Sequence, residues 1–152
     1  MTSVAKAFDP GTVLLAKHAQ HVVLVHFPIA LFITGVALGW AGRWTRREAL
    51  AQAGYYNLLI AAASTLPVIV TGLLAWRFQL EAQRLKGILL LHLVMGCASS
   101  VLICATGWLH FRAGRRGAAL PGYLRMVEGL AVIAVGLTGH LGGFLSGVNG
   151  GQ

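Results

Sequence analysis

The sequence predicts an all-α integral membrane protein, folded as an up-down bundle of four transmembrane helices. Of its 152 residues, 57% are hydrophobic and only 11% are charged, and the mean hydropathy is +0.73. This composition is typical of a membrane protein rather than of a soluble domain. The apolar residues form four separate runs, and each is long enough for the ~20 residues that cross a bilayer. Short connections between successive runs favour antiparallel neighbours in one bundle.

Charged and aromatic residues separate the four runs, as they do at a membrane interface. Trp40, Trp44 and Trp108 mark one interface, and Trp76 marks the other. The charged connections read RWTRREALAQAG, RFQLEAQRLK and RAGRRGAALPG. The four spans are expected, in order, at about Gln20 to Ala41, Tyr55 to Trp76, Gly87 to Phe111 and Tyr123 to Val148.

These spans define one domain with two short flanking segments. Residues 20–148 are expected to form a single four-helix transmembrane domain. Residues 1–19 are expected to be an N-terminal tail or a short interfacial helix, because Pro10-Gly11 interrupts them. Residues 149–152 are expected to be a C-terminal tail.

The net charge of +8 comes from Lys and Arg residues that flank the spans. Such charge is ordinary for a membrane protein, so a nucleic-acid partner is not expected. The bias of positive charge favours an orientation in which both termini lie outside the cytoplasm. Seven residues lie on one side and five on the other: Arg43, Arg46, Arg47, Arg112, Arg115, Arg116 and Arg125 against Lys6, Lys17, Arg77, Arg84 and Lys86.

Carboxylates are too few for two common classes of membrane site. The chain has four, and only Glu128 lies within an apolar run, near its start. A di-iron carboxylate centre needs several inward-facing glutamates, and a carboxylate-based ion pump needs acids at mid-membrane. Both classes are excluded. The absence of a C-x-x-C-H motif likewise argues against covalently attached haem.

Three histidines are predicted to lie at a similar depth near one membrane face. His26 is early in the first span, His92 is early in the third, and His140 is late in the fourth. Because successive spans alternate in direction, all three are near the same face, roughly 7–12 Å in from the helix ends. His21 lies above them, toward water, whereas His110 ends the third span at the opposite face and is interpreted as interfacial.

One helical turn deeper than each histidine, the residue on the same face is small: Ala30 at i+4 from His26, Gly96 at i+4 from His92 and Gly136 at i−4 from His140. Gly143, at i+3 from His140, extends this groove toward the end of the span. Residues at these spacings share a helix face. A metal ion needs no such groove, whereas a flat macrocycle does, because the backbone must approach its plane. The pattern therefore favours haem b held by axial histidines.

The number of histidines limits the number of haems. His26, His92 and His140 provide one ligand pair and one spare residue, and His21 would complete a second pair. One haem is expected, two remain compatible with the count, and the pairing stays open. Arg77 and Arg84 lie on the histidine-rich side, where they could meet the haem propionates.

Two motifs resemble a bacterial membrane family known as domain of unknown function 2231. The first is HVVLVHFPIAL, where the family usually has H-P-x-x-V-H-F-P-I-A-L, so that Val22 replaces a proline. The second is the C-terminal GHLGGFL, which is similar to the family's G-H-x-G-G-x-L run. The resemblance covers all four spans and implies the same fold. Some relatives look fused to cytochrome-type domains, which fits redox work.

The leading hypothesis is a small b-type cytochrome subunit that transfers electrons within a larger redox complex. Such a subunit would not be a catalyst in its own right, and its partners would be other subunits, quinone or a soluble cytochrome. A second hypothesis is a copper or zinc site built on His26, His92, His140 and His21. A third is a structural or pigment-binding subunit. A visible spectrum and metal analysis would discriminate these classes.

Overall fold

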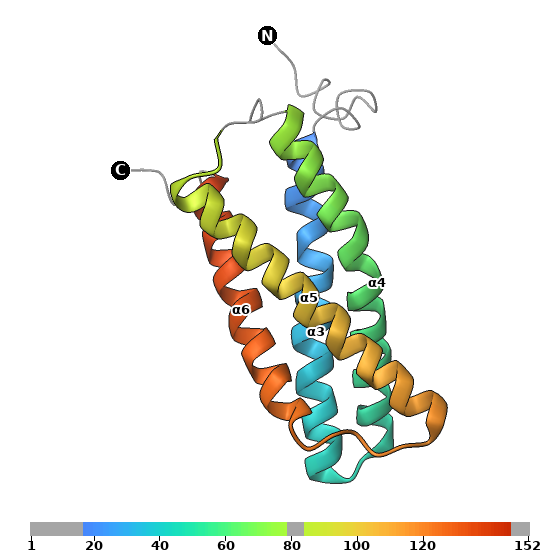
Figure 1. The fold of residues 1–152 in the computed structure, drawn as a ribbon. Helices are drawn as coiled ribbons and strands as arrows, with labels where there is room; N and C mark the ends of the chain where they lie inside the picture. The colour runs from blue at the N-terminus through green and yellow to red at the C-terminus, as the bar shows by residue number, and fades with distance from the viewer. Residues whose placement is uncertain (1–16, 79–83, 147–152) are drawn as a thin grey trace.

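The computed structural model describes residues 17–78 and 84–146, and all four of its elements are helices. The helices alternate in direction, so α3 and α5 begin at the end of the bundle where α4 and α6 finish (Figure 1). We call this the histidine end and the other the basic end. The four helices are α3 (Lys17–Thr45), α4 (Glu48–Phe78), α5 (Gly87–Arg116) and α6 (Leu124–Leu145).

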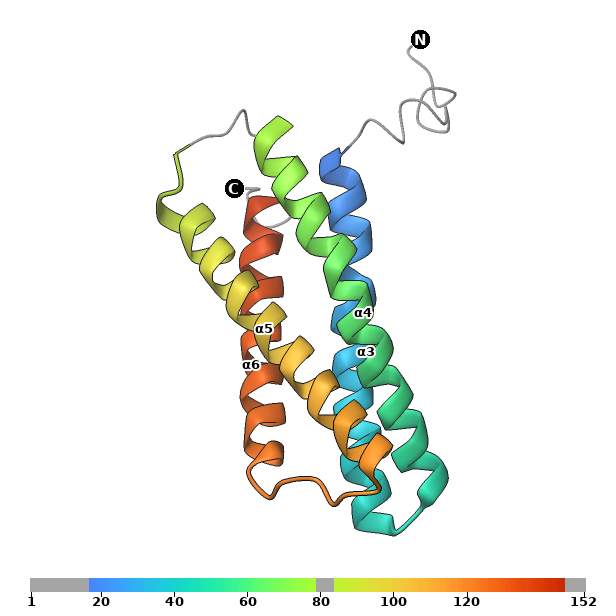
Figure 2. The same cartoon turned by 45° about the vertical axis from the view of Figure 1, so that its right-hand side comes forward.

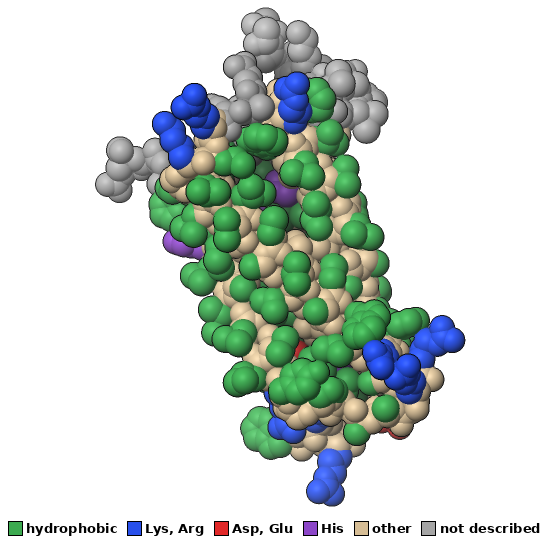
Figure 3. Space-filling view, viewed as in Figure 1, with side chains coloured by type: hydrophobic (Ala, Val, Ile, Leu, Met, Phe, Trp, Pro, Cys, Tyr) green, Lys and Arg blue, Asp and Glu red, His purple; other side chains and the backbone are tan. Residues whose placement is uncertain are grey.

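All four helices are long and apolar enough to cross a membrane. Hydrophobic side chains cover the middle of the molecule, whereas Lys and Arg gather at its two ends (Figure 3). This is the surface expected of a chain whose middle lies in hydrocarbon and whose ends meet water. The predicted fold class, an all-α membrane bundle of four transmembrane helices, is confirmed.

The helices extend beyond the predicted spans at the basic end. α3 continues to Thr45 and α4 begins at Glu48, so most of the segment predicted as the first loop is helical. Arg46, with a φ of 54°, makes the turn, and the backbone N–H of Arg47 donates to the carbonyl of Gly42. Hydropathy marks only the part of a helix that crosses the bilayer, and helix-forming Ala, Leu, Glu and Arg continue it into the interface.

Close packing of α3 on α4 depends on glycine. A Cβ built on Gly54 would lie 2.6 Å from the backbone nitrogen of Gly39 and 2.8 Å from the carbonyl oxygen of Gly35. The Gly35-x-x-x-Gly39 face therefore receives Gly54 with the two backbones in contact. At the turn, a Cβ on Gly42 would meet the backbone of Ala51 at 2.5 Å.

The other helices pack less evenly. α5 crosses the bundle obliquely, and toward the histidine end it diverges from α4 (Figures 1 and 2). At the basic half, Gly107 of α5 lies against Ala62 of α4. α3 and α6 meet at few points along their length. The buried core lies where the helices converge and comprises Phe32, Val36, Leu58, Ala61, Ile103, Ala131 and Val135.

Candidate functional site

The helix directions place His21, His26, His92 and His140 in the half of the bundle at the histidine end, as the sequence predicted. On the face drawn in Figure 3, histidine side chains reach the surface only in that half. The helices that carry these residues differ in rotation, however, so the four side chains enter different interfaces.

His26 is exposed on α3, and its imidazole is fixed by its own helix. Its Nδ1 lies 2.6 Å from the carbonyl oxygen of Val22. A carbonyl only accepts hydrogen bonds, so Nδ1 carries the proton and donates it. In the neutral ring, Nε2 is then an acceptor that points away from the helix. A backbone hydrogen bond at Nδ1 is the usual way in which proteins hold an imidazole that binds a metal through Nε2.

His140 is exposed on α6, and its ring is held by an aromatic neighbour. The Phe144 ring lies edge to face with it, with ring centroids 5.0 Å apart and an interplanar angle of 88°. Residues four apart share a helix face, so Gly136, His140 and Phe144 form one row. No atom of the described residues outside its own helix backbone and chain neighbours lies within 4 Å of a Cβ built on Gly136, so the backbone of α6 is accessible beside His140.

His26 and His140 border the same seam between two helices. Ile29 of α3 reaches Gly139 of α6, with its Cδ1 3.9 Å from a Cβ built there. His26 lies one turn before Ile29, and His140 directly follows Gly139. Because both side chains are exposed, they flank the α3–α6 seam on its outer surface. Measured along the helices at the rise per residue, His26 and His140 differ in level by only about 3 Å.

His92 enters a different interface, between α5 and α6. Its Cε1 lies 3.2 Å from a Cβ built on Gly142, so a larger residue at that position would displace the ring. The side chain is half-buried, and its buried Nδ1 has no hydrogen-bond partner among residues 17–78 and 84–146. One to two turns deeper, Ser99 and Thr138 join the same two helices through hydroxyl groups 2.9 Å apart.

His21 packs against α4. Its Nδ1 lies 3.2 Å from Oγ1 of Thr71, and its Cε1 lies 2.9 Å from a Cβ built on Gly72. Gly72 therefore makes room for the imidazole. This histidine is half-buried in the α3–α4 interface, away from the outer seam bordered by His26 and His140.

The remaining predicted residues lie at or near the histidine end without forming one pocket. Arg77, at the end of α4, is exposed, and its guanidinium lies 5.8 Å from the centroid of the Phe78 ring. Arg84 and Lys86 are exposed just before α5. Gly96 has room beside it, with Thr138 3.8 Å from a Cβ built there. Gly143 is half-buried near the end of α6.

No three metal-ligating side chains converge anywhere in residues 17–78 and 84–146. His26 and His140 share the outer seam, whereas His92 and His21 lie in two other interfaces. The described residues thus offer one pair of histidines, His26 and His140, rather than the three- or four-residue set of protein ligands that is typical of copper and zinc sites.

A second polar cluster, at the basic end, was missed by sequence reasoning. Glu128 of α6 is 1% exposed. Its Oε1 accepts a hydrogen bond of 2.8 Å from Nε2 of His110 on α5. Its Oε2 accepts hydrogen bonds from the indole nitrogen of Trp40 and from Arg43 at 3.2 Å. We call these four residues the Glu128 cluster, which joins α3, α5 and α6.

The prediction that His110 ends the third helix was wrong, because α5 continues to Arg116 and leaves His110 more than a turn inside the helix. The side chain is also buried within the bundle, with 6% of its surface exposed. The signal was available: Glu128 is the one acid within a predicted span. A carboxylate inside a membrane bundle needs a partner, and the antiparallel order of α5 and α6 places His110 at its level.

The model of the family described as predicted membrane protein (DUF2231) matches residues 17–151. This is nearly the whole chain, so the chain belongs to that family, and the resemblance seen in its two end motifs is confirmed. No curated protein and no solved structure matches it.

Proposed function

We propose that this DUF2231 protein is a small b-type cytochrome subunit, with haem b bound at the outer α3–α6 seam by His26 and His140. The observation that carries the proposal is the bond from Nδ1 of His26 to the carbonyl of Val22. It leaves Nε2 as an outward-facing acceptor, and His140 lies across the seam at nearly the same level. Haem b with two histidine ligands has no open position on iron, so it would supply reversible one-electron transfer.

The residues around the seam support a flat ligand. Gly136 leaves the backbone of α6 open beside His140, and among the described residues Ile29 is the one side chain, apart from the chain neighbours, within 4 Å of a Cβ built on Gly139. A macrocycle needs this backbone access, whereas a bare ion does not. Phe144 restrains the His140 ring. The cations of the same end are candidates to pair with the propionates: Arg77, Arg84 and Lys86.

His92 is the alternative ligand. Its buried Nδ1 has no partner, and Gly142 and Gly96 leave space around it. Its position between α5 and α6 separates it from the outer seam, so we assign it to a neighbouring role. A second haem on His92 and His21 would require His21 to leave Thr71.

A chain with little surface outside its helices fits a subunit of a larger redox complex. We propose that it lies in the bacterial inner membrane with the histidine end toward the periplasm, as the distribution of Lys and Arg favours. Quinol or a soluble cytochrome reaching that end would exchange electrons with the haem.

The test is the visible spectrum of the full-length protein purified from haem-replete cells, oxidised and after reduction with dithionite. A sharp α band on reduction is expected, together with a low-spin ferric signal in electron paramagnetic resonance. His26→Ala and His140→Ala should each lose the haem. Phe27→Ala, an exposed neighbour of His26, is the matched control and should keep it.

Two outcomes would reject the proposal at different levels. A colourless protein from haem-replete cells would eliminate haem and leave a structural or metal-binding subunit, which metal analysis distinguishes. Loss of the haem in His92→Ala but not in His140→Ala would retain the cytochrome and reject the ligand pair.

A further inference from the structure

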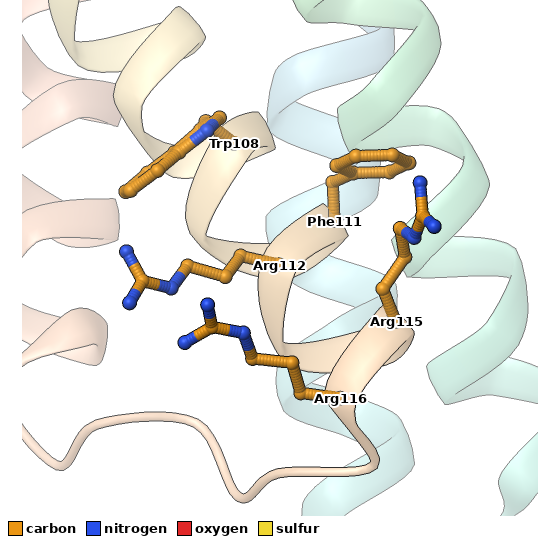
Figure 4. A pocket seen from close by; sticks show the side chains of 5 residues that line it. All are labelled: Trp108, Phe111, Arg112, Arg115 and Arg116. Carbon is orange, nitrogen blue, oxygen red and sulfur yellow. The ribbon is translucent and has the colours of Figure 1, made fainter.

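Three arginines lie in the last two turns of α5, at the basic end and away from the histidines. The guanidinium of Arg112 lies 5.2 Å from the Trp108 ring centroid, and that of Arg115 lies 5.8 Å from the Phe111 ring centroid. Figure 4 shows Arg112 and Arg116 extending to the same side of α5, with Arg115 directed to the other side over Phe111. Arg112 and Arg116 thus form a two-pronged fork beside the indole.

This fork lines two open hollows on the protein surface. One open hollow of about 410 Å³ is lined by the three arginines, Trp108 and Phe111. A second, of about 400 Å³, shares Trp108, Arg112 and Arg116 and extends over apolar residues of α5 and of the segment before α6. Its apolar lining includes Leu109, Pro121 and Tyr123. Cationic and apolar surfaces therefore adjoin in two open hollows that share Trp108, Arg112 and Arg116, and we call the two together the Trp108 groove.

In residues 17–78 and 84–146, no carboxylate forms an ion pair with the fork. Within the described part of the chain, the ion pairs of Glu128 go to Arg43 and His110, and none reaches Arg112, Arg115 or Arg116. Positive charge alone is ordinary at the end of a span. A hollow that joins two guanidinium groups to an aromatic platform and an apolar wall is a more specific feature, and it matches a molecule with an anionic head and an apolar tail.

We propose that the Trp108 groove binds an anionic phospholipid. The phosphodiester would lie between Arg112 and Arg116, because guanidinium groups bind phosphate oxygens through paired N–H donors. An acyl chain would follow Trp108 and Leu109, which precede Arg112 in α5 and lie deeper in the bundle, into the bilayer. Basic pockets between transmembrane helices bind anionic headgroups in this way. A free phosphate would satisfy the arginines but leave the apolar lining without a role.

The test uses the full-length protein in nanodiscs of phosphatidylcholine that contain a small fraction of lipid brominated on its acyl chains. Bromine quenches tryptophan at contact, and subtracting the emission of Trp108→Phe isolates the emission of Trp108. Brominated phosphatidylglycerol is expected to quench Trp108 several-fold more strongly than brominated phosphatidylcholine. Arg112→Gln/Arg116→Gln should remove this preference, so that the two brominated lipids quench Trp108 almost equally. The matched control, Arg46→Gln/Arg47→Gln, removes the same charge from the same end and should keep it.

Equal quenching by the two brominated lipids would overturn the proposal, as would loss of the preference in the Arg46→Gln/Arg47→Gln control, which would show a general charge effect. Inorganic phosphate should displace the lipid no better than sodium chloride at equal ionic strength; better displacement would assign the fork to free phosphate. If the Arg112→Gln/Arg116→Gln protein does not fold, the wild type still decides, because the preference must fall as salt screens the fork.

Discussion

Glu128→Ala is expected to destabilise the bundle strongly, because it leaves hydrogen-bond donors on α3 and α5 without their acceptor. Buried His110 loses its acceptor, which costs about 1–3 kcal/mol for an unsatisfied polar group. The Trp40 indole also loses its hydrogen-bond acceptor, but at a smaller cost because this residue is partly exposed to solvent. Arg43, with a side chain 31% exposed, can turn to water, so its contribution is under about 1 kcal/mol. The expected loss is roughly 3–5 kcal/mol, as for breaking a buried ion pair.

The assay is equilibrium unfolding in mixed micelles of increasing SDS content, followed by tryptophan emission and circular dichroism. Glu48→Ala is the matched control, since Glu48 is exposed in the first turn of α4 and contributes only the 0.3–1 kcal/mol typical of a charge at a helix terminus. A double-mutant cycle of Glu128→Ala with His110→Ala should give a coupling of about 1–3 kcal/mol. A loss for Glu128→Ala no larger than that for Glu48→Ala would refute the cluster as a stabilising unit.

Two further predictions concern glycines. Gly54→Ala would bring a methyl group to within 2.6 Å of the backbone nitrogen of Gly39, so it should cost about 1–3 kcal/mol in the same titration; Gly122→Ala, where a methyl meets nothing within 4 Å, is the neutral control, and equal midpoints would contradict the close packing. Gly136→Leu should leave the unfolding midpoint unchanged but lower the haem content, because its side chain would cover the α6 backbone beside the proposed haem; full haem content would place the cofactor elsewhere.

The sequence predicts the number, order and direction of the helices well, because the apolar runs and charged connections record the bilayer directly. It also predicts the level of a residue along its helix, since the rise per residue is constant. His26 and His140 therefore lie at one end, as expected. The sequence does not predict how each helix is rotated, because rotation depends on which partners a helix packs against. For that reason His92 and His26, at similar depth, enter different interfaces.

The Glu128 cluster was missed for a related reason. Judged from apolarity, the third span stops at Phe111, and this makes His110 terminal. The helix continues to Arg116, which places His110 six residues, or about 9 Å, inside it. Hydropathy reports where a helix leaves the hydrocarbon, not where its backbone hydrogen bonds end. The apolar run therefore does not identify His110 as a buried residue. The need of the Glu128 carboxylate for a hydrogen-bond partner does.

The α3–α6 seam is held together differently at the two ends of the bundle. At the basic end, Trp40 and Arg43 are tied to Glu128, so the two helices are held together by directed bonds. Toward the histidine end, the seam has only light packing, such as Ile29 beside Gly139. Because the first contact restrains both helices, the second need not be tightly packed for the bundle to stay closed. A flat ligand could therefore enter the seam beside His26 and His140 without displacing core side chains, which is the physical requirement of the proposed haem site.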